Sequence, residues 1–239
     1  MTDRCLYMPH PENTLKGRAQ RIFRRLSYDL WRRELKRMGL QKHTRGECTI
    51  VDVGCGPGFL LQCLEKWFPK ANIVGVDAND QLLEVARVRC NNVQLLNGDA
   101  CSIPLGDQTA DVVFALHVIE HLPAPALFFS EARRVLRPSG RLIIATPNAA
   151  GLGARLMKEK WVGFSDPTHI ALNNPSFWRR NIVTSGFSIS RDGTTGLTGV
   201  PWLNRMPLGL LHWVPTFLWG TFPWNLGEAY LCIAIKPTN

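Results

Sequence analysis

The chain has 239 residues, of which 45% are hydrophobic and 20% charged, and its formal net charge is +9. This composition is ample for one α/β domain with insertions. Seven cysteines, an odd number without a Cys-x-x-Cys pair, exclude a disulfide framework or a zinc ribbon and predict reduced, buried thiols. Because the N-terminus has no apolar signal core, we expect a cytoplasmic protein.

The positive charge is concentrated near the N-terminus. Residues 16–45 hold eleven Lys or Arg against two acids, and the rest of the chain is neutral. Apolar residues at helical spacing predict a basic helix over 18–38, within an N-terminal cap spanning 1–45. This helix is either a solvated outer face or a surface for an anionic partner. Nucleic acid is not expected as that partner, since no RNA-binding module accompanies the charge.

Short apolar runs alternate with helical patterns along the remaining chain, which is typical of a parallel sheet covered on both faces. Strands are expected at 48–53, 72–76, 93–97, 111–115, 140–145, 186–190 and 229–235, with helices at 58–68, 79–89, 124–136 and 174–184. We expect residues 46–190 and 228–239 to form this doubly wound core.

A glycine loop follows the first strand at once. Gly54, Gly56 and Gly58 let the backbone turn tightly and approach a ligand, and they direct the next helix N-terminus at it. The second strand ends in Asp77, whose carboxylate can accept hydrogen bonds from both ribose hydroxyls of a nucleoside. The sequence therefore predicts a nucleoside-cofactor site at the sheet edge.

The loop differs from two better-known nucleotide loops. A dinucleotide fingerprint requires Gly or Ala where Phe59 stands, and no Gly-Lys-Ser/Thr follows for a P-loop. Asp52, two residues before Gly54, would suit an ammonium group and repel a pyrophosphate. The pattern is thus Asp-x-Gly-x-Gly-x-Gly.

Three further motifs follow in order. Asn97-Gly98-Asp99-Ala100 comes after the third strand, and the fourth strand, 110–115, leads into Leu116-His117-Val118-Ile119-Glu120-His121-Leu122. Pro138-Ser139-Gly140 opens the fifth strand. With these motifs, residues 45–190 resemble the class I S-adenosylmethionine-dependent methyltransferases, particularly small-molecule enzymes such as those of ubiquinone biosynthesis.

The resemblance implies a Rossmann-like, mostly parallel seven-stranded sheet whose last strand is antiparallel. It also implies S-adenosyl-L-methionine as cofactor, with Asp99 and the next backbone N–H on the adenine and the residues after the fourth strand near the methionine end. The implied cofactor-binding residues are Asp52, Gly54, Cys55, Gly56, Gly58, Asp77, Ala78, Asp99, Ala100 and His117.

Two inserts, 148–173 and 191–227, leave the carboxyl ends of strands, where open α/β sheets bind ligands, so both are interpreted as substrate-side cover. The second is rich in Trp and Pro from Val200 to Trp224, and its prolines exclude a straight membrane-spanning helix. Three alternatives stay open for it: a lid forming an apolar pocket, a membrane-touching element, or a homodimer interface.

Methyl transfer to oxygen or nitrogen also releases a proton, for which histidine is the natural base. His169 lies in the first insert, where Asp166 could orient it; a capping or packing role is the alternative. His117 follows the fourth strand, near the expected methyl group. His121 shares its face if that turn is helical.

A metal is not expected. The string His117-x-x-Glu120-His121 matches the inverted zinc-protease motif, but the resemblance already explains it and Pro123 stops the helix. Some quinone-pathway O-methyltransferases carry Glu-x-x-Glu-His here and bind a divalent cation. In this chain His117 replaces the first Glu, which leaves Glu120 and His121 as the metal candidates.

The sequence thus predicts a methyltransferase acting on oxygen or nitrogen of a small, largely apolar or aromatic acceptor. One alternative is an enzyme for a membrane-embedded quinone or lipid, with peripheral membrane contact through the basic helix and the Trp-rich insert. The other is a non-catalytic, cofactor-binding partner protein.

Overall fold

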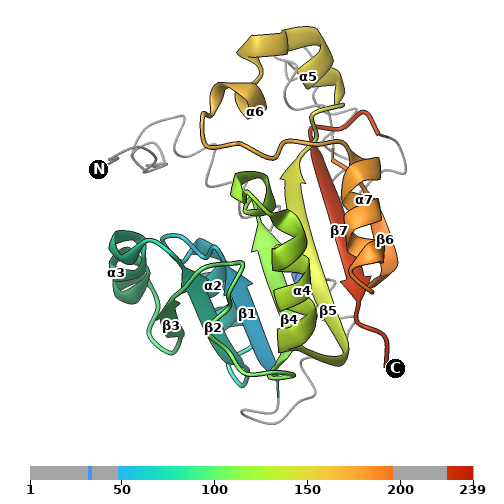
Figure 1. Cartoon of the computed structure of the whole chain (residues 1–239). Helices are drawn as coiled ribbons and strands as arrows, with labels where there is room; N and C mark the ends of the chain where they lie inside the picture. The colour runs from blue at the N-terminus through green and yellow to red at the C-terminus, as the bar shows by residue number, and fades with distance from the viewer. Residues whose placement is uncertain (1–31, 34–47, 196–224, 239) are drawn as a thin grey trace. The chain divides into compact units, whose positions relative to one another are not determined.

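The computed structural model describes residues 32–33, 48–195 and 225–238 (Figure 1). The chain divides into two units, Met1–Gln41 and Lys42–Asn239, and the second holds all the strands found in the described residues. Most of the predicted basic helix and the Trp-rich stretch of the second insert lie outside the described residues, although residues 32–33 are helical.

The core is one seven-stranded sheet in the order β3-β2-β1-β4-β5-β7-β6. Its strands are β1 Thr49–Val53, β2 Asn72–Asp77, β3 Gln94–Asn97, β4 Ala110–Leu116, β5 Leu136–Pro147, β6 Ser188–Thr194 and β7 Ala229–Ile235. All neighbours pair in parallel except β7, which is antiparallel to both β5 and β6. The Rossmann-like sheet and its antiparallel last strand are therefore confirmed.

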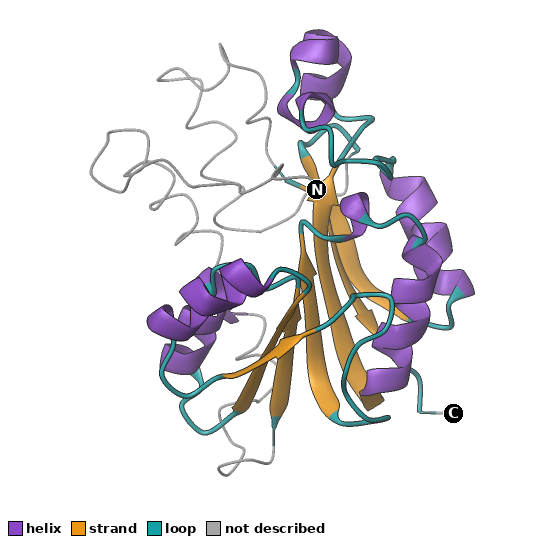
Figure 2. Cartoon of the chain, turned by 60° about the vertical axis from the view of Figure 1, so that its left-hand side comes forward, coloured by secondary structure: helices purple, strands orange, loops and turns teal. Residues whose placement is uncertain are grey.

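Helices cover both faces of this sheet (Figure 2). They are α2 Phe59–Trp67, α3 Asp80–Arg89, α4 Pro125–Val135 and α7 Pro175–Thr184. Every residue of β1 is buried, as expected for a central strand shielded on both faces. Phe128, Phe129 and Trp178 anchor the core on the side of α4 and α7, and each is fully buried.

Caps explain where the helices begin. Asn79 caps α3 by accepting hydrogen bonds from two backbone N–H groups, and Asn174 caps α7 by accepting one, from Phe177, ahead of Pro175. By contrast, α2 has no side-chain cap, because Gly58 precedes it with φ of 78°. The first N–H groups of α2 are thus left for another acceptor.

The structure differs from the prediction around β5 and the first insert. β5 begins at Leu136 rather than at residue 140, since Leu136 pairs with Ala110 before a bulge. No helix was predicted within the first insert, yet it contains α5 Leu152–Met157, the 3-10 turn η3 Lys158–Lys160 and α6 Val162–Ser165. Glycines dilute the helical signal of these short elements.

The strands β6 and β7 stay paired up to the two ends of the second insert. Thr194 pairs with Tyr230, Thr195 N–H donates to the Ala229 carbonyl at 2.9 Å, and Gly227 N–H donates to Thr194 Oγ1 at 3.0 Å. β6 therefore runs into the segment predicted as insert. The sheet is complete up to the point where that segment leaves it.

The six cysteines in the described part of the chain are free; four are buried, as predicted, whereas Cys63 and Cys101 are only partly buried. In that same part, none of the helices combines the length and the apolar character that crossing a bilayer requires.

Candidate functional site

The glycine loop bends back over the end of β2. Gly54 N–H and Cys55 N–H both donate to the Val76 carbonyl, at 2.7 and 3.1 Å. Gly54, Gly56 and Gly58 all have left-handed φ, of 70°, 51° and 78°. Each position would be strained by any residue with a Cβ.

The glycines also differ in their surroundings. A Cβ on Gly54 would lie 2.3 Å from Val118 Cγ2, and one on Gly58 would lie 3.0 Å from Ala86 Cβ. A Cβ on Gly56 would meet nothing within 4 Å. Gly54 and Gly58 are thus required because neighbouring side chains leave no room for a Cβ, whereas Gly56 leaves open space on the ligand side of the loop.

Asp77 is fastened to this loop. Its Oδ2 accepts Gly56 N–H at 2.7 Å and its Oδ1 accepts Asn79 N–H at 2.9 Å. Each carboxylate oxygen can accept a second hydrogen bond, so Asp77 retains capacity for a ligand. The glycine loop, residues 54–58, and Asp77 at the end of β2 are therefore joined into one continuous rim, called the rim below.

Asp52 lies beneath the rim and is 3% exposed. Burial first, and the negative charge of Asp77 second, raise the pKa of Asp52 to about 8. The carboxyl group is therefore mostly protonated at neutral pH. A cation bound beside it would offset both effects, whereas an anion would add to them.

The third rim segment comes after β3. Gly98 N–H donates to the Asp77 carbonyl at 3.1 Å, which ties this segment to the end of β2. Asp99 is exposed, and its Oδ1 accepts Cys101 N–H at 2.8 Å. Ala78 is also exposed. The Cys55 side chain is buried, so only its backbone can face a ligand.

On the other side of β1, the chain leaves β4 through His117, which has a left-handed φ of 58°. Its Nδ1 lies 3.3 Å from Glu120 Oε1, and Glu120 Oε2 accepts the Thr146 hydroxyl at 3.0 Å. Glu120 is fully buried, whereas 59% of the His117 side chain is exposed. A buried carboxylate thus orients an accessible imidazole.

His117 and Glu120 each favour the charged form of the other. Desolvation disfavours the imidazolium of His117, but the hydrogen bond and charge of Glu120 outweigh it and raise the pKa of His117. Desolvation likewise opposes ionisation of Glu120, but His117 lowers its pKa below the usual value. Glu120 is therefore ionised and acts as an acceptor.

Two more histidines meet beside this pair. His121 ends the 3-10 turn η2, Ile119–His121, and its ring centroid lies 4.7 Å from that of His169. His121 Nδ1 lies 2.9 Å from Thr168 Oγ1, while His169 Nδ1 lies 2.7 Å from the Gly163 carbonyl. His169 is thus oriented by a backbone carbonyl, with Asp166 Oδ2 3.8 Å from its Nε2.

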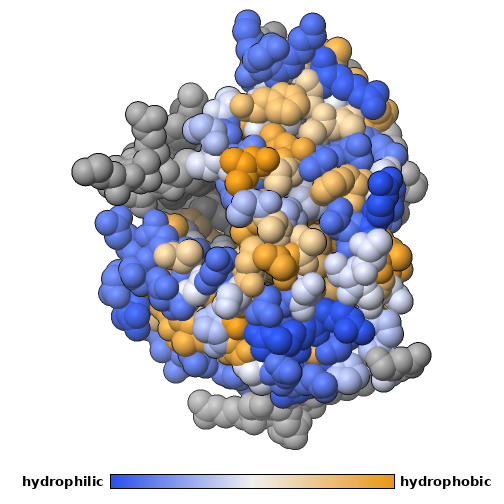
Figure 3. Space-filling model, viewed as in Figure 1, coloured by the Kyte–Doolittle hydropathy of each residue, from blue (hydrophilic) through white to orange (hydrophobic). Residues whose placement is uncertain are grey.

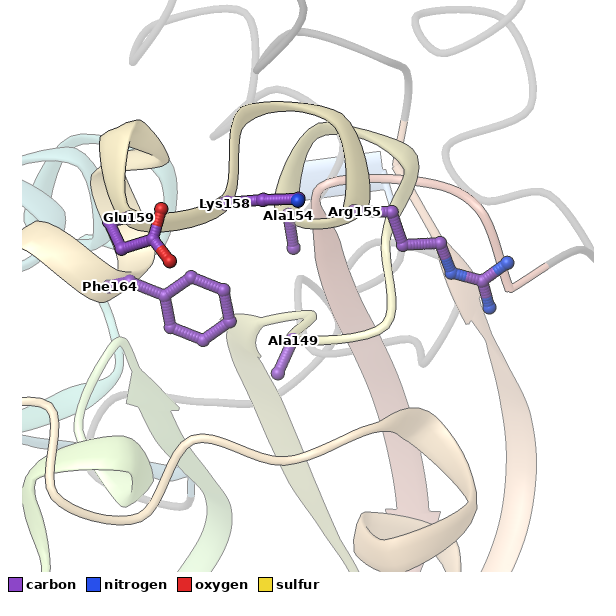
Figure 4. Close-up of a pocket in the computed structure, with 6 residues that line it drawn as sticks. All are labelled: Ala149, Ala154, Arg155, Lys158, Glu159 and Phe164. Carbon is purple, nitrogen blue, oxygen red and sulfur yellow. The ribbon is translucent and has the colours of Figure 1, made fainter.

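The first insert is anchored from below by Glu228. Its carboxylate accepts Trp161 Nε1–H at 2.7 Å and Gly153 N–H at 3.1 Å, all within buried surroundings. A pocket of about 450 Å³ opens in this insert, where Phe164 faces Ala149 (Figure 4). Arg155, Lys158 and Glu159 supply its charged lining.

Sequence reasoning overlooked the residues that position these groups. Thr146 supports Glu120, Thr168 supports His121, and Val118 fills the space above Gly54. Only Thr168 carried a local signal, because Asp166-Pro167-Thr168 is a turn-forming string with one residue on either side of the proline. The others act through contacts that no sequence period reveals.

Known proteins resemble this chain over its core. The methyltransferase-domain family matches residues 51–144. A malonyl-[acyl-carrier protein] O-methyltransferase from Hahella chejuensis is 33% identical over 150 residues, covering 60% of this chain and 53% of that protein. A probable S-adenosylmethionine-dependent methyltransferase from Mycolicibacterium smegmatis is 31% identical over 137 residues, covering 57% and 50%.

A solved structure has the same fold. It is the phosphoethanolamine N-methyltransferase 2 of Haemonchus contortus in complex with phosphomonomethylethanolamine and S-adenosylhomocysteine. Its TM-score is 0.63 at 19% identity, covering 87% of this chain and 53% of that chain. The chain spans only about half the length of the two curated relatives, 53% and 50%.

Proposed function

Residues 51–144 are a methyltransferase domain within a class I S-adenosylmethionine-dependent methyltransferase fold, and from this premise we propose the reaction. The protein moves a methyl group from S-adenosylmethionine to an oxygen or nitrogen of a small, largely apolar or aromatic acceptor. The observation that supports this most is the rim in which Asp77 holds Gly56 N–H above the buried Asp52.

The residues present fit this cofactor. Open space beside Gly56 admits a ligand close to the backbone, and Asp77 has acceptor capacity for a ribose. Two carboxyl groups so close together favour a cationic ligand over a pyrophosphate. In this assignment Asp52 faces the ammonium group, and Asp99 with Ala100 receives the adenine.

When bound, S-adenosylmethionine supplies an activated methyl group, so the protein has to align the acceptor and exclude water. We assign the general base to His117. Because Glu120 is ionised and only accepts, His117 carries its proton at Nδ1 and keeps Nε2 as the acceptor for a proton from the substrate.

The acceptor is proposed to enter from the side of the first insert. The pocket of Figure 4 combines the apolar Phe164, Ala149 and Ala154 with two cations and one acid. Such a lining suits an apolar body that carries a polar or ionised group. The predicted contribution of the Trp-rich insert falls outside the described residues.

The test is calorimetric titration with S-adenosylmethionine, S-adenosylhomocysteine and NADH, followed by transfer of labelled methyl groups to a panel of acceptors. We expect both sulfur nucleosides to bind, NADH not to bind, and label to appear in a phenol, carboxylate or amine. Binding of NADH alone, or of nothing, contradicts the assignment. Cofactor binding with no transfer to any acceptor would favour the non-catalytic partner protein.

One observation favours a second candidate, an acceptor embedded in a membrane. The first insert exposes large apolar side chains next to Arg155, Lys158 and Lys160, and Figure 3 shows apolar surface just below its hydrophilic tip. The apolar side chains are Leu156, Val162, Phe164 and Ile170. Flotation with anionic but not neutral vesicles is the expected result for this candidate; failure to float with either contradicts it.

A further inference from the structure

Two adjacent residues, Glu120 and His121, converge behind the site with His169 of the first insert. One donor atom from each of Glu120, His121 and His169 lies within 4.8 Å of the other two. Glu120 is fully buried and both histidines are partly buried. Two imidazoles and a carboxylate at this separation can reach one metal ion.

The hydrogen bonds of His121 determine its tautomer. Thr168 Oγ1 donates to Asp166 Oδ1 at 2.6 Å, so its proton is committed and the hydroxyl accepts from His121. The Thr168 carbonyl, 3.2 Å from the same nitrogen, also only accepts. His121 therefore carries its proton at Nδ1, which leaves the lone pair on Nε2.

His169 is constrained in the same way. Its Nδ1 lies 2.7 Å from the Gly163 carbonyl, which accepts only, so this nitrogen carries the proton. Asp166 Oδ2 is 3.8 Å from Nε2, beyond hydrogen-bond distance. Within the described residues, neither Nε2 of the two histidines makes a hydrogen bond.

This is the arrangement that metal-binding histidines adopt. Such histidines donate the ring N–H that is not coordinated to a carbonyl or carboxylate, which fixes the ring and the tautomer. Glu120 is supported likewise, because His117 and Thr146 donate to its two oxygens. Each ligand candidate is thus held in place by a partner outside the cluster.

We propose that Glu120, His121 and His169 bind one divalent transition-metal ion of the zinc type. Two imidazoles select such ions over magnesium, which prefers an all-oxygen shell. Three protein ligands leave at least one coordination position open. The metal site is independent of methyl transfer, since it can be measured with neither cofactor nor acceptor present.

The experiment measures metal on the purified full chain after chelation and dialysis. Zn²⁺ and Mg²⁺ are titrated by calorimetry, bound metal is quantified by mass spectrometry, and Co²⁺ substitution gives an absorption spectrum. We expect one equivalent of Zn²⁺, no binding of Mg²⁺, and a Co²⁺ spectrum without a thiolate charge-transfer band. A thiolate band would assign the metal to cysteine and overturn the proposal.

Variants test the ligands one at a time. His121→Ala and His169→Ala are expected to lose Zn²⁺ affinity by at least about 100-fold, and Thr168→Val, which keeps all three ligands, by about 10-fold. His43→Ala is the control, because it removes one histidine from the chain but none from the cluster. Full affinity in both alanine variants would overturn the proposal.

Folding is followed on the same samples by thermal unfolding without metal. Zn²⁺ is expected to raise Tm in the parent and in His43→Ala but not in His121→Ala. If an alanine variant is unfolded, the Thr168→Val variant provides the test instead, and an unchanged Zn²⁺ affinity in that variant contradicts the proposal. S-adenosylmethionine binding is measured on the same samples to distinguish the two proposals. If the protein binds the cofactor but not Zn²⁺, only the metal site is contradicted. If it binds Zn²⁺ but not the cofactor, only the proposed reaction is contradicted.

Discussion

The carboxyl edge of the sheet has two halves built in different ways. Beyond β1 and β2 the site is backbone: three left-handed glycines, N–H groups turned inward, and one carboxylate fastened to them. Beyond β4 and β5 the site consists of side chains. His117 and Glu120 follow β4 and Thr146 lies on β5, while His121 contacts Thr168 of the first insert.

The two halves differ in how readily substitutions can change their chemistry. A backbone rim recognises groups common to every nucleoside cofactor and depends on a contiguous stretch of chain. A side-chain cluster can change its chemistry by single substitutions without altering the fold. The first half should therefore respond to substitution in cofactor affinity, and the second in turnover.

Asp77→Ala should give the largest effect on cofactor affinity. Hydrogen bonds to a charged group are each worth about 1.5–3 kcal/mol, so losing two predicts a fall in S-adenosylmethionine affinity of about 100-fold or more. Calorimetry measures it. Asp80→Ala, which removes an exposed acid three residues on, is the control, and equal affinities for the two variants would refute the role of Asp77.

His117→Asn tests the other half. Asparagine tolerates the left-handed backbone at this position, so the substitution removes the base with little strain. Turnover should fall by about 10²–10⁴-fold while cofactor affinity changes far less. Gln108→Asn, at another left-handed residue, controls for the backbone. A loss confined to cofactor affinity would place His117 in the first half of the site instead.

Gly54→Ala sharpens the contrast within the glycine loop. Left-handed strain and the contact with Val118 together predict a loss of about 2–3 kcal/mol in the free energy of unfolding. Adding Val118→Ala should relieve the contact but not the strain. Gly56→Ala should cost less stability, since its Cβ meets no protein atom, and more cofactor affinity. Urea unfolding measures the stabilities; an equal cost at both glycines would contradict this reading.

The burial of Asp52 is expected to make the stability of the protein depend on pH. Its pKa is about 8 in the folded protein against an ordinary value of 3.8, so between these values the folded state binds more protons. Its contribution to stability is therefore present at low pH and falls as pH rises, by up to roughly 1.4 kcal/mol per unit.

Asp52→Asn should remove that slope. The measurement compares urea unfolding of the parent and the variant at pH 5 and pH 7, where the group's titration in the unfolded state is complete. Parallel pH dependences in the two proteins would show that Asp52 is not buried in its protonated form.

The same two halves divide what the sequence could predict. The glycine loop and Asp77 lie in a contiguous motif, and β7 was predicted at its observed bounds because its apolar run is uninterrupted. The approach of His169 to His121 depends on how the first insert folds. Trp161 and Glu228 fix that fold by a contact between distant residues, and no local pattern encodes it.

Because β6 and β7 pair with each other up to the ends of the second insert, the sheet is complete without that insert. Gly227 N–H and the Ala229 carbonyl bind Thr194 and Thr195 where the insert departs and returns. Its length therefore costs little, since each doubling of a closed loop adds only about 0.6 kcal/mol. We therefore expect this segment to tolerate lengthening or replacement without refolding the sheet.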